Sequence, residues 1–186
     1  MAELRYTAYL DNNSIGENSE QIFYDQFDLK SNCYSHVEYI DSKPVAAIRA
    51  CVLNPKEKIN AIPAMEIFAK EIEQATKEND VVLETNKFVI HPSFQSRGLK
   101  LKFNLFSFIF KMAYRVNANY IIVAVRRQHA NFYRCMNFYP ISGAKQYPGL
   151  NFSTVLLMHK FNTVEGSFMD LSDKIKARLN INALAA

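Results

Sequence analysis

The middle of this sequence contains no acidic side chain. Residues 85–164 carry 11 lysines and arginines but no aspartate or glutamate, whereas the 15 acids of residues 1–84 give that segment a net charge of −7. A segment with charge of one sign creates a positive field wherever it folds together. The charge pattern therefore predicts an anionic partner, which is a phosphate compound, a nucleic acid or an acidic protein, unless the basic side chains are simply solvated.

Tryptophan, cysteine and long apolar runs are also scarce. The sequence has 14 phenylalanines but no tryptophan, so the core must be rich in phenylalanine. The cysteines, Cys33, Cys51 and Cys135, are odd in number and far apart, which argues against a disulfide framework and for a reduced, cytoplasmic setting. No apolar run approaches the roughly 18 residues that span a bilayer, no secretory signal begins the chain, and the histidines lack metal-ligand spacing. We expect neither a metal site nor a transmembrane segment.

The apolar residues alternate between strand and helix periodicity along the chain. A length of 186 residues suits one domain, which we expect to span residues 1–186. Strands are expected at 34–40, 45–53, 81–90, 120–125 and 153–161, and helices near 20–27, 63–78, 99–116, 129–138 and in a tail at 165–186. The strands at 81–90 and 120–125 should be parallel, joined by a right-handed helical crossover. The pattern predicts a mixed α/β sheet with helices on both faces.

The stretch "HPSFQSRGLK" lies where the strand at 81–90 gives way to a helix. The first backbone N–H groups of a helix are unpaired and its dipole favours negative charge, so a glycine there lets a phosphate approach closely. Gly98 is that glycine, and Arg97 and Lys100 add positive charge. The alternative is that Gly98 only eases a turn and that both cations are solvated.

The same stretch resembles the acyl-CoA pyrophosphate-binding motif of the GNAT superfamily of N-acyltransferases. Its core pattern is Q/R-x-x-G-x-G/A, and the segment that would bind the cofactor comprises Gln95, Ser96, Arg97, Gly98, Leu99 and Lys100. Lys100 departs from the pattern, because a small residue is usual there. A second segment, "NFYRCMNF", is similar to the family's "FYEKLGF" helix, with Tyr133 at the tyrosine and Asn137 in place of glycine. The resemblance implies a mostly antiparallel central sheet with one parallel βαβ unit.

Residues 22–161 are most similar to one branch, the N-acyl amino acid synthases and acyl-homoserine-lactone synthases. The shared features are "YDQFD" at 24–28, Arg49 after the hairpin, and "ETNKF" at 84–88, where Lys87 replaces the usual arginine. Lysine keeps the charge but loses bidentate recognition. The branch implies an acyl donor that is acyl-CoA or acyl-carrier protein, and an amine acceptor such as an amino acid. Acyl-carrier protein is strongly acidic, which would account for the basic segment.

Two residues are candidates for the chemistry of thioester aminolysis. Glu84 lies among apolar neighbours in a strand, where burial raises the pKa of a carboxyl group, and could take the amine's proton. The alternative is an exposed strand carboxylate. Tyr133 could donate a proton to the departing sulfur, or it could be a core tyrosine with a satisfied hydroxyl.

The remaining candidates would bind the two substrates. Backbone N–H groups around Val89 and Ile90 should hold the pantetheine arm and polarise the carbonyl, where the two parallel strands would separate. The candidates for the acceptor are Arg49, Asn86, Lys87 and His129. A cation could pair with an acceptor carboxylate. Arg49 could equally pair internally with Asp25 or Asp28, and His129 could simply cap its helix.

Three other functions compete with this interpretation. The first is an acetyl-CoA-dependent acetyltransferase of a small amine or a protein. The second is a nucleic-acid-binding module that uses the basic segment and its interleaved aromatic residues. The third is a GNAT-like fold without activity, because the motif departs at Lys87, Lys100 and Asn137. The nucleic-acid-binding interpretation does not explain the order strand, turn, glycine, helix or Glu84, and Lys100 and the "YDQFD" segment argue against the acetyltransferase.

Overall fold

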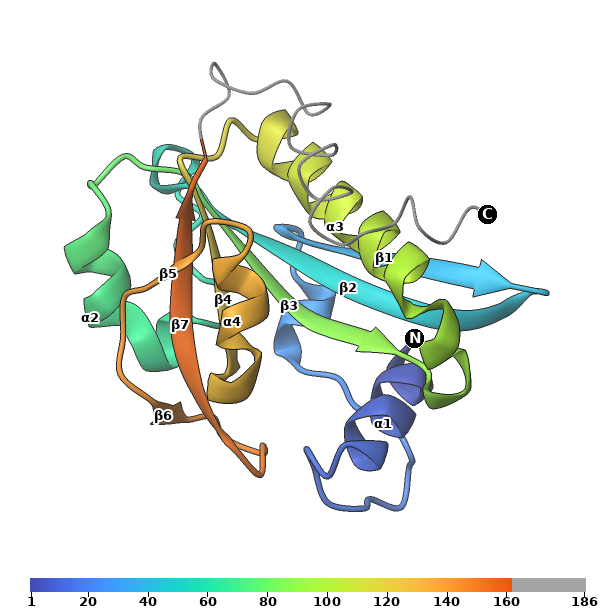
Figure 1. The fold of residues 1–186 in the computed structure, drawn as a ribbon. Helices are drawn as coiled ribbons and strands as arrows, with labels where there is room; N and C mark the ends of the chain where they lie inside the picture. Colours follow the sequence, from blue (N-terminus) through green and yellow to red (C-terminus); the bar gives the residue numbers. More distant parts are fainter. Residues whose placement is uncertain (162–186) are drawn as a thin grey trace.

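The computed structural model describes residues 1–161, and a mixed sheet runs through the whole of that part (Figure 1). Its strands follow the order β1-β2-β3-β4-β7-β5, and β6 pairs with β7 beside β5. The strands are β1 (Cys33–Ile40), β2 (Lys43–Leu53), β3 (Val82–Ile90), β4 (Tyr120–Arg126), β5 (Tyr139–Pro140), β6 (Lys145–Gln146) and β7 (Ser153–Lys160). Among the strands of residues 1–161 only β3 and β4 are parallel, so the expected mostly antiparallel sheet with one βαβ unit is confirmed.

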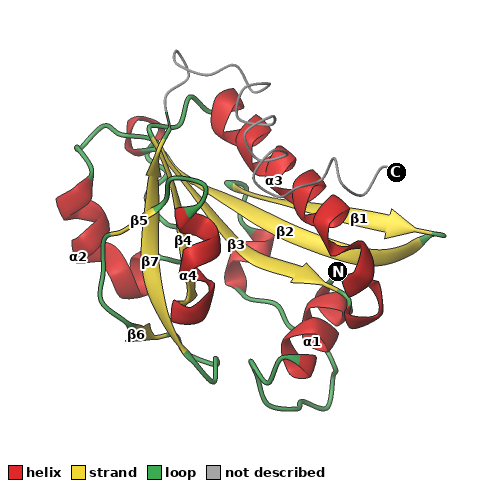
Figure 2. Cartoon of the chain, in the orientation of Figure 1, coloured by secondary structure: helices red, strands yellow, loops and turns green. Residues whose placement is uncertain are grey.

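Helices cover both faces of this sheet (Figure 2). They are α1 (Ala2–Asp11), α2 (Met65–Ala75), α3 (Gly98–Arg115) and α4 (Ala130–Arg134), with short 3₁₀ helices at Gln26–Leu29, Pro55–Glu57, Pro92–Arg97 and Arg127–His129. The core under α3 and α4 includes Leu105, Phe106 and Tyr133, whereas Phe68 and Ile72 of α2 pack on the other face. On that second face α1 also packs, through Leu4 and Ala8.

The N-terminal region departs from the sequence-based expectations. The helix expected near 20–27 is wrong, because the chain there is irregular, with a turn at 19–20, and only Gln26–Leu29 turns as a 3₁₀ helix. The helix α1 was not expected, since Arg5 is buried beside Leu4 and Ala8 and weakens the contrast between an apolar and a polar face. The tail expected to be helical at 165–186 lies outside the described residues. Within the described part, no helix is both long and apolar enough to cross a bilayer.

Cys33 and Cys51 lie opposite one another, which their separation in the sequence had hidden. They are direct partners in the antiparallel pair β1–β2, and the thiol of Cys33 donates a hydrogen bond to the sulfur of Cys51. Both are free cysteines, as is Cys135 on the surface.

The two halves of the sheet separate between β3 and β4. Parallel pairing covers only residues 82–85 of β3 and 120–123 of β4, after which the strands diverge. Figure 1 shows the divergence as a V, with β1–β3 on one arm and β4 and β7 on the other. The irregular register between β2 and β3 coincides with Lys87, whose φ of 52° is in the left-handed region. Such a bulge bends a strand, and here it turns β3 away from β4.

Candidate active site

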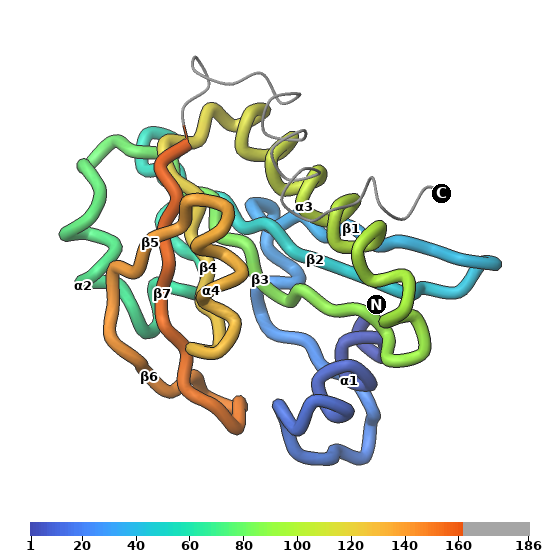
Figure 3. Tube along the Cα trace, viewed as in Figure 1, coloured from blue at the N-terminus to red at the C-terminus, as the bar shows by residue number. Residues whose placement is uncertain are grey.

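A cleft of about 860 Å³ lies where β3 and β4 separate. Its walls come from β3 (residues 84–90), from β4 (residues 123–126) and from the first turns of α3 and α4. The connection that follows α1 and the loop at residues 147–152 also border it, and the tube in Figure 3 shows their paths at the ends of the two arms. The cleft therefore reaches both faces of the sheet through the gap in its middle.

Glu84 lies on the cleft wall and is almost completely buried, with 1% of its surface exposed. One carboxylate oxygen accepts a hydrogen bond from the backbone N–H of Ala64 at 2.7 Å, and the other accepts one from Nδ2 of Asn86 at 2.8 Å. Burial raises the pKa of Glu84 to about 7, although these two hydrogen bonds and the charge of Arg49 lower it. The alternative of an exposed strand carboxylate is wrong, and Glu84 can exchange a proton near neutral pH.

Arg49 is 1% exposed, and its guanidinium is held by carboxylates of the "YDQFD" segment. It contacts both oxygens of Asp25, at 2.6 and 2.9 Å, and Oδ1 of Asp28 at 2.9 Å. Asp28 also pairs with the buried Arg5 at 2.7 Å. The two aspartates cap the 3₁₀ helix at Gln26–Leu29 reciprocally, which fixes their direction. Of the two roles considered for Arg49, the internal ion pair is therefore formed.

Asn86 and Lys87 extend this polar network along β3. Oδ1 of Asn86 accepts a hydrogen bond from Nε of Arg49 at 2.8 Å, so the amide connects Arg49 to Glu84. The ammonium group of Lys87 lies 3.2 Å from Asp25 and 3.7 Å from the centre of the Phe23 ring. Burial lowers the pKa of Lys87 to about 8, although Asp25 opposes the shift. Arg49 and Lys87 are thus both engaged in ion pairs within the chain.

The glycine turn begins α3 on the opposite side of the cleft. Gly98 is buried and has φ −59° and ψ −33°, so it does not serve a strained turn. A Cβ added there would meet only Cδ1 of Ile90, at 4.0 Å. The fold therefore does not require glycine at this position. Of the six residues from 95 to 100, Gln95 and Gly98 line the cleft, whereas Ser96, Arg97 and Lys100 are exposed and Leu99 is half-buried.

The other predicted residues also border the cleft. Tyr133 is buried, burial raises the pKa of its hydroxyl, and that hydroxyl has no hydrogen bond within residues 1–161. His129 is exposed and makes no capping hydrogen bond to its helix. Val89 pairs with Ala47 of β2. Two residues further on, the N–H of His91 donates to the carbonyl of Val45, also on β2. Because N–H directions alternate along a strand, the N–H of Ile90 is directed toward the gap beside β4.

Two departures from the family motif have a structural explanation. Asn137 replaces glycine at a position with φ 62°, and asparagine is the residue that tolerates this left-handed conformation best after glycine. Lys87 replaces arginine but retains an ion pair with Asp25. Neither position therefore marks damage to the site.

Sequence reasoning missed two residues of the cleft. Tyr147 has a buried hydroxyl without a hydrogen-bond partner in the described part of the chain, and burial, assisted by the charge of Glu84, raises its pKa. Arg126 ends β4 and packs on Phe152. A signal existed for Arg126, because it is the first charge after the apolar run "YIIVAV", but its partners lie more than 100 residues away in the sequence. Among residues 1–161, no group of three or more His, Cys, Asp or Glu side chains could hold a metal ion.

The chain has the fold of solved GNAT-like acyltransferase structures, with a parallel strand pair that opens beside a helix that begins with glycine, and it is an acyltransferase. More narrowly, it belongs to the FeeM N-acyl amino acid synthase family, whose model matches residues 1–160. The resemblance noted in residues 22–161 is thereby confirmed, and the match also includes α1. No curated protein matches the chain in sequence.

Solved structures with this fold include three that illustrate its range. FeeM, an N-acyl amino acid synthase from uncultured soil microbes, has a TM-score of 0.67 at 15% identity over 84% of this chain and 86% of its own. MesI, a CoA-dependent acyl-homoserine lactone synthase, has a TM-score of 0.63 at 14% identity over 96% and 85%. ElaA of Escherichia coli has a TM-score of 0.55 at 12% identity over 85% and 86%.

Substituting Gly98 tests the glycine turn. We expect Gly98→Val to lower the affinity for acyl-CoA by about tenfold or more, because a branched side chain would stand where phosphate must meet the helix N-terminus. Folding should persist, since the backbone there is helical and uncrowded. Calorimetric titration with CoA measures the affinity. Gly143→Val, at another uncrowded glycine outside the cleft, is the matched control. Unchanged affinity in Gly98→Val would show that the anion binds elsewhere.

Proposed function

We propose that this enzyme transfers an acyl group from a phosphopantetheine thioester to the amino group of an amino acid. The observation that carries the proposal is Glu84, a buried carboxylate on the wall of a cleft with a pKa of about 7. A general base works best when its pKa lies near the working pH. The glycine at the start of α3, on the other side of the gap, supports a donor whose phosphates lie at that helix N-terminus.

The proposed reaction assigns a proton transfer to each of two side chains. Glu84 takes a proton from the acceptor's ammonium group, and the freed nitrogen attacks the thioester carbonyl. The oxyanion that develops accepts a hydrogen bond from the N–H of Ile90. Attack forms the C–N bond, and collapse of the tetrahedral intermediate then breaks the C–S bond. The departing thiolate takes a proton from the hydroxyl of Tyr133, the nitrogen gives up its second proton to restore that hydroxyl as it becomes an amide, and Glu84 releases the first proton to solvent. Burial keeps that hydroxyl protonated, which suits a proton donor.

Lipid extracts of cells that overproduce the protein test the proposed activity. Mass spectra should show N-acylated amino acids that are absent from cells producing Glu84→Gln at the same level. This variant keeps the shape of the side chain but cannot accept a proton. An acetylated small amine, with no longer acyl product, would instead support the acetyltransferase alternative. Extracts identical to those of the empty vector would contradict the proposal.

The pH dependence of turnover tests the role of Glu84 as a base. Because the raised pKa keeps Glu84 protonated below about 7, kcat/KM should rise as pH increases through 7. Glu84→Gln should lower turnover by roughly 10²-fold and remove this rise, because general-base catalysis contributes on that scale. Initial rates between pH 5.5 and 9 measure both effects, and binding of CoA should be unchanged. Turnover close to that of the wild type would remove Glu84 from the mechanism.

We further propose that acyl-carrier protein is the better donor. Coenzyme A and carrier protein present the same phosphopantetheine, so the cleft alone does not choose between them. Outside the cleft, α3 exposes Lys100 and Lys111, which are 11 residues apart and hence on one side of the helix after three turns. Two lysines spaced along a helix can attract an acidic protein surface, whereas a small coenzyme contacts only the cations close to its phosphates.

Charge reversal on α3 tests the donor. Lys100→Glu with Lys111→Glu should lower kcat/KM for acyl-carrier protein at least about tenfold more than for the corresponding acyl-CoA, because steering is lost. The wild-type rate with carrier protein should also fall as salt rises, since the field is screened over about 8–10 Å. Lys43→Glu with Lys56→Glu, two exposed lysines of the acidic half, is the matched control. Equal loss with both donors would contradict docking on α3.

A further inference from the structure

The cations that border the cleft fall into two groups. Arg49 and Lys87 are ion-paired with Asp25 and Asp28, of which Asp28 also pairs with the buried Arg5. Lys102 and Arg126 also line the cleft, and neither forms an ion pair with a carboxylate within residues 1–161. These two cations are therefore the ones whose charge remains available to a bound anion.

Lys102 and Arg126 approach the cleft from different faces of the sheet. Lys102 lies on α3, beside the glycine turn, with its ammonium group 5.8 Å from the centre of the Phe132 ring. On β4, Ile122 packs against the α2 face, so alternation directs Arg126 to that face too. Glu84 lies on the same face, because its neighbour Val82 and its partner Cys51 belong to the α2 core. Lys102 thus lies on the face where the acyl donor is proposed to bind, and Arg126 lies on the same face as Glu84.

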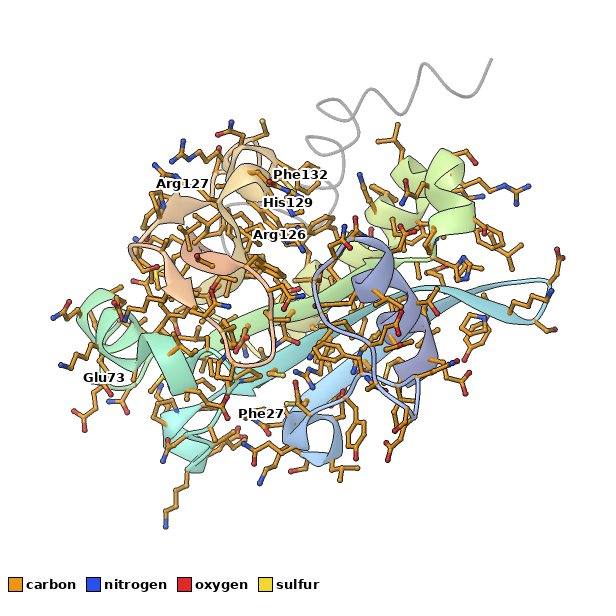
Figure 4. The ribbon with its side chains drawn as sticks, turned by 90° about the horizontal axis from the view of Figure 1, so that it is seen from below. Phe27, Glu73, Arg126, Arg127, His129 and Phe132 are labelled. Atoms are coloured by element: carbon orange, nitrogen blue, oxygen red, sulfur yellow. The ribbon has the colours of Figure 1, made fainter. Side chains whose placement is uncertain are left out.

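The guanidinium of Arg126 is held by a ring contact and two hydrogen bonds, but some of its N–H groups make no hydrogen bond within residues 1–161. Its Cζ lies 3.9 Å from the centre of the Phe152 ring, and Nη2 donates to the carbonyl of Asn12 at 3.1 Å and to Oγ of Ser14 at 2.5 Å. Within the described residues, neither Nε nor Nη1 donates a hydrogen bond. Figure 4 labels Arg126 at the end of β4, together with Arg127 and His129 of the segment that leads into α4.

We infer that Arg126 binds the carboxylate of the acceptor amino acid, an inference that rests on the proposed function. A guanidinium presents N–H groups in a planar fork that matches a carboxylate. Parallel register sets Glu84 level with Ile122, so Arg126 lies four residues, about 13 Å, further along the strand. Both residues line the same cleft, so an amino acid bound between them would direct its amine to Glu84 and its carboxylate to Arg126. Acceptors without a carboxylate lack this second contact.

The contacts of Arg126 also allow a purely structural role. Through Asn12 and Ser14 it ties the end of α1 to β4, and the N–H of Asn151 donates to the carbonyl of Ser14 at 2.8 Å in the same region. A test must therefore separate loss of this tie from loss of the carboxylate contact. Ser14→Ala removes part of the tie and leaves the guanidinium in place.

The experiment compares amino acids with their amides, in which the carboxylate becomes a neutral carboxamide. The full chain is assayed with one acyl-CoA and the twenty common amino acids, and the best acceptor is then measured beside its amide. The wild type should favour the acid in kcat/KM by about tenfold or more, the scale of a charge-assisted hydrogen bond. Arg126→Gln should lose most of this preference by acting more slowly on the acid alone. Arg127→Gln and Ser14→Ala should retain it.

Each other outcome has a definite meaning. Equal loss of both acceptors in Arg126→Gln, the same loss in Ser14→Ala, or weaker binding of CoA would overturn the inference. If the wild type acylates no acceptor, the proposed function fails, and calorimetric titration of the CoA-saturated protein with the same amino acids decides the inference. Binding by the wild type that is lost in Arg126→Gln but kept in Arg127→Gln would still support it. Absence of binding to the wild type would overturn it.

Discussion

Burial of the Arg49 guanidinium is the constraint on which the arrangement of the site depends. A buried charge must be paired and hydrogen-bonded, because removing it from water is otherwise very costly. Two aspartates of one short 3₁₀ segment provide the pairing, and this holds residues 24–29 against the sheet. Nε of Arg49 donates a hydrogen bond to the side chain of Asn86, and Asn86 in turn donates one to the carboxylate of Glu84. The orientation of the proposed base thus follows from the need to neutralise an arginine on the neighbouring strand.

The uneven distribution of charge along the sequence is resolved by the way its halves meet. Acids of the N-terminal half neutralise cations at the base of the cleft, as Asp25 does for Arg49 and Lys87. The basic half contributes α3, β4 and α4, whose own sequences contain no acidic residue, and two of their cations, Lys102 and Arg126, line the cleft. A positive field therefore remains on the side where a phosphopantetheine donor would arrive.

Divergence of β3 from β4 produces the cleft, and the backbone itself is the cause. The bulge at Lys87 changes the direction of β3 just beyond the last residues paired with β4. A continuous sheet would satisfy the N–H of Ile90 with a neighbouring strand, whereas the divergence leaves it directed into the gap. The same local irregularity therefore opens the space and supplies a hydrogen-bond donor to it.

Local patterns in the sequence were sufficient to predict most of the sheet and part of the site. Alternation and apolar runs predicted β1 to β4 and β7, because strand and helix periodicity depends on neighbouring residues. Glu84 and Gly98 could be predicted because each stands out against its local background, a carboxylate in an apolar strand and a glycine at a strand-to-helix junction.

The tertiary structure decided which charges remain free. Whether Arg49 binds a substrate or an aspartate depends on the path of the chain, which places Asp25 against Arg49 although the two are 24 residues apart in the sequence. The surroundings of Arg126 come from α1 and from the loop before β7, far away in the sequence on either side. The helix α1 gave no periodic signal, because it buries the ion-paired Arg5 as well as apolar residues. Ion pairing and burial depend on distances in space, and only the folded chain sets those distances.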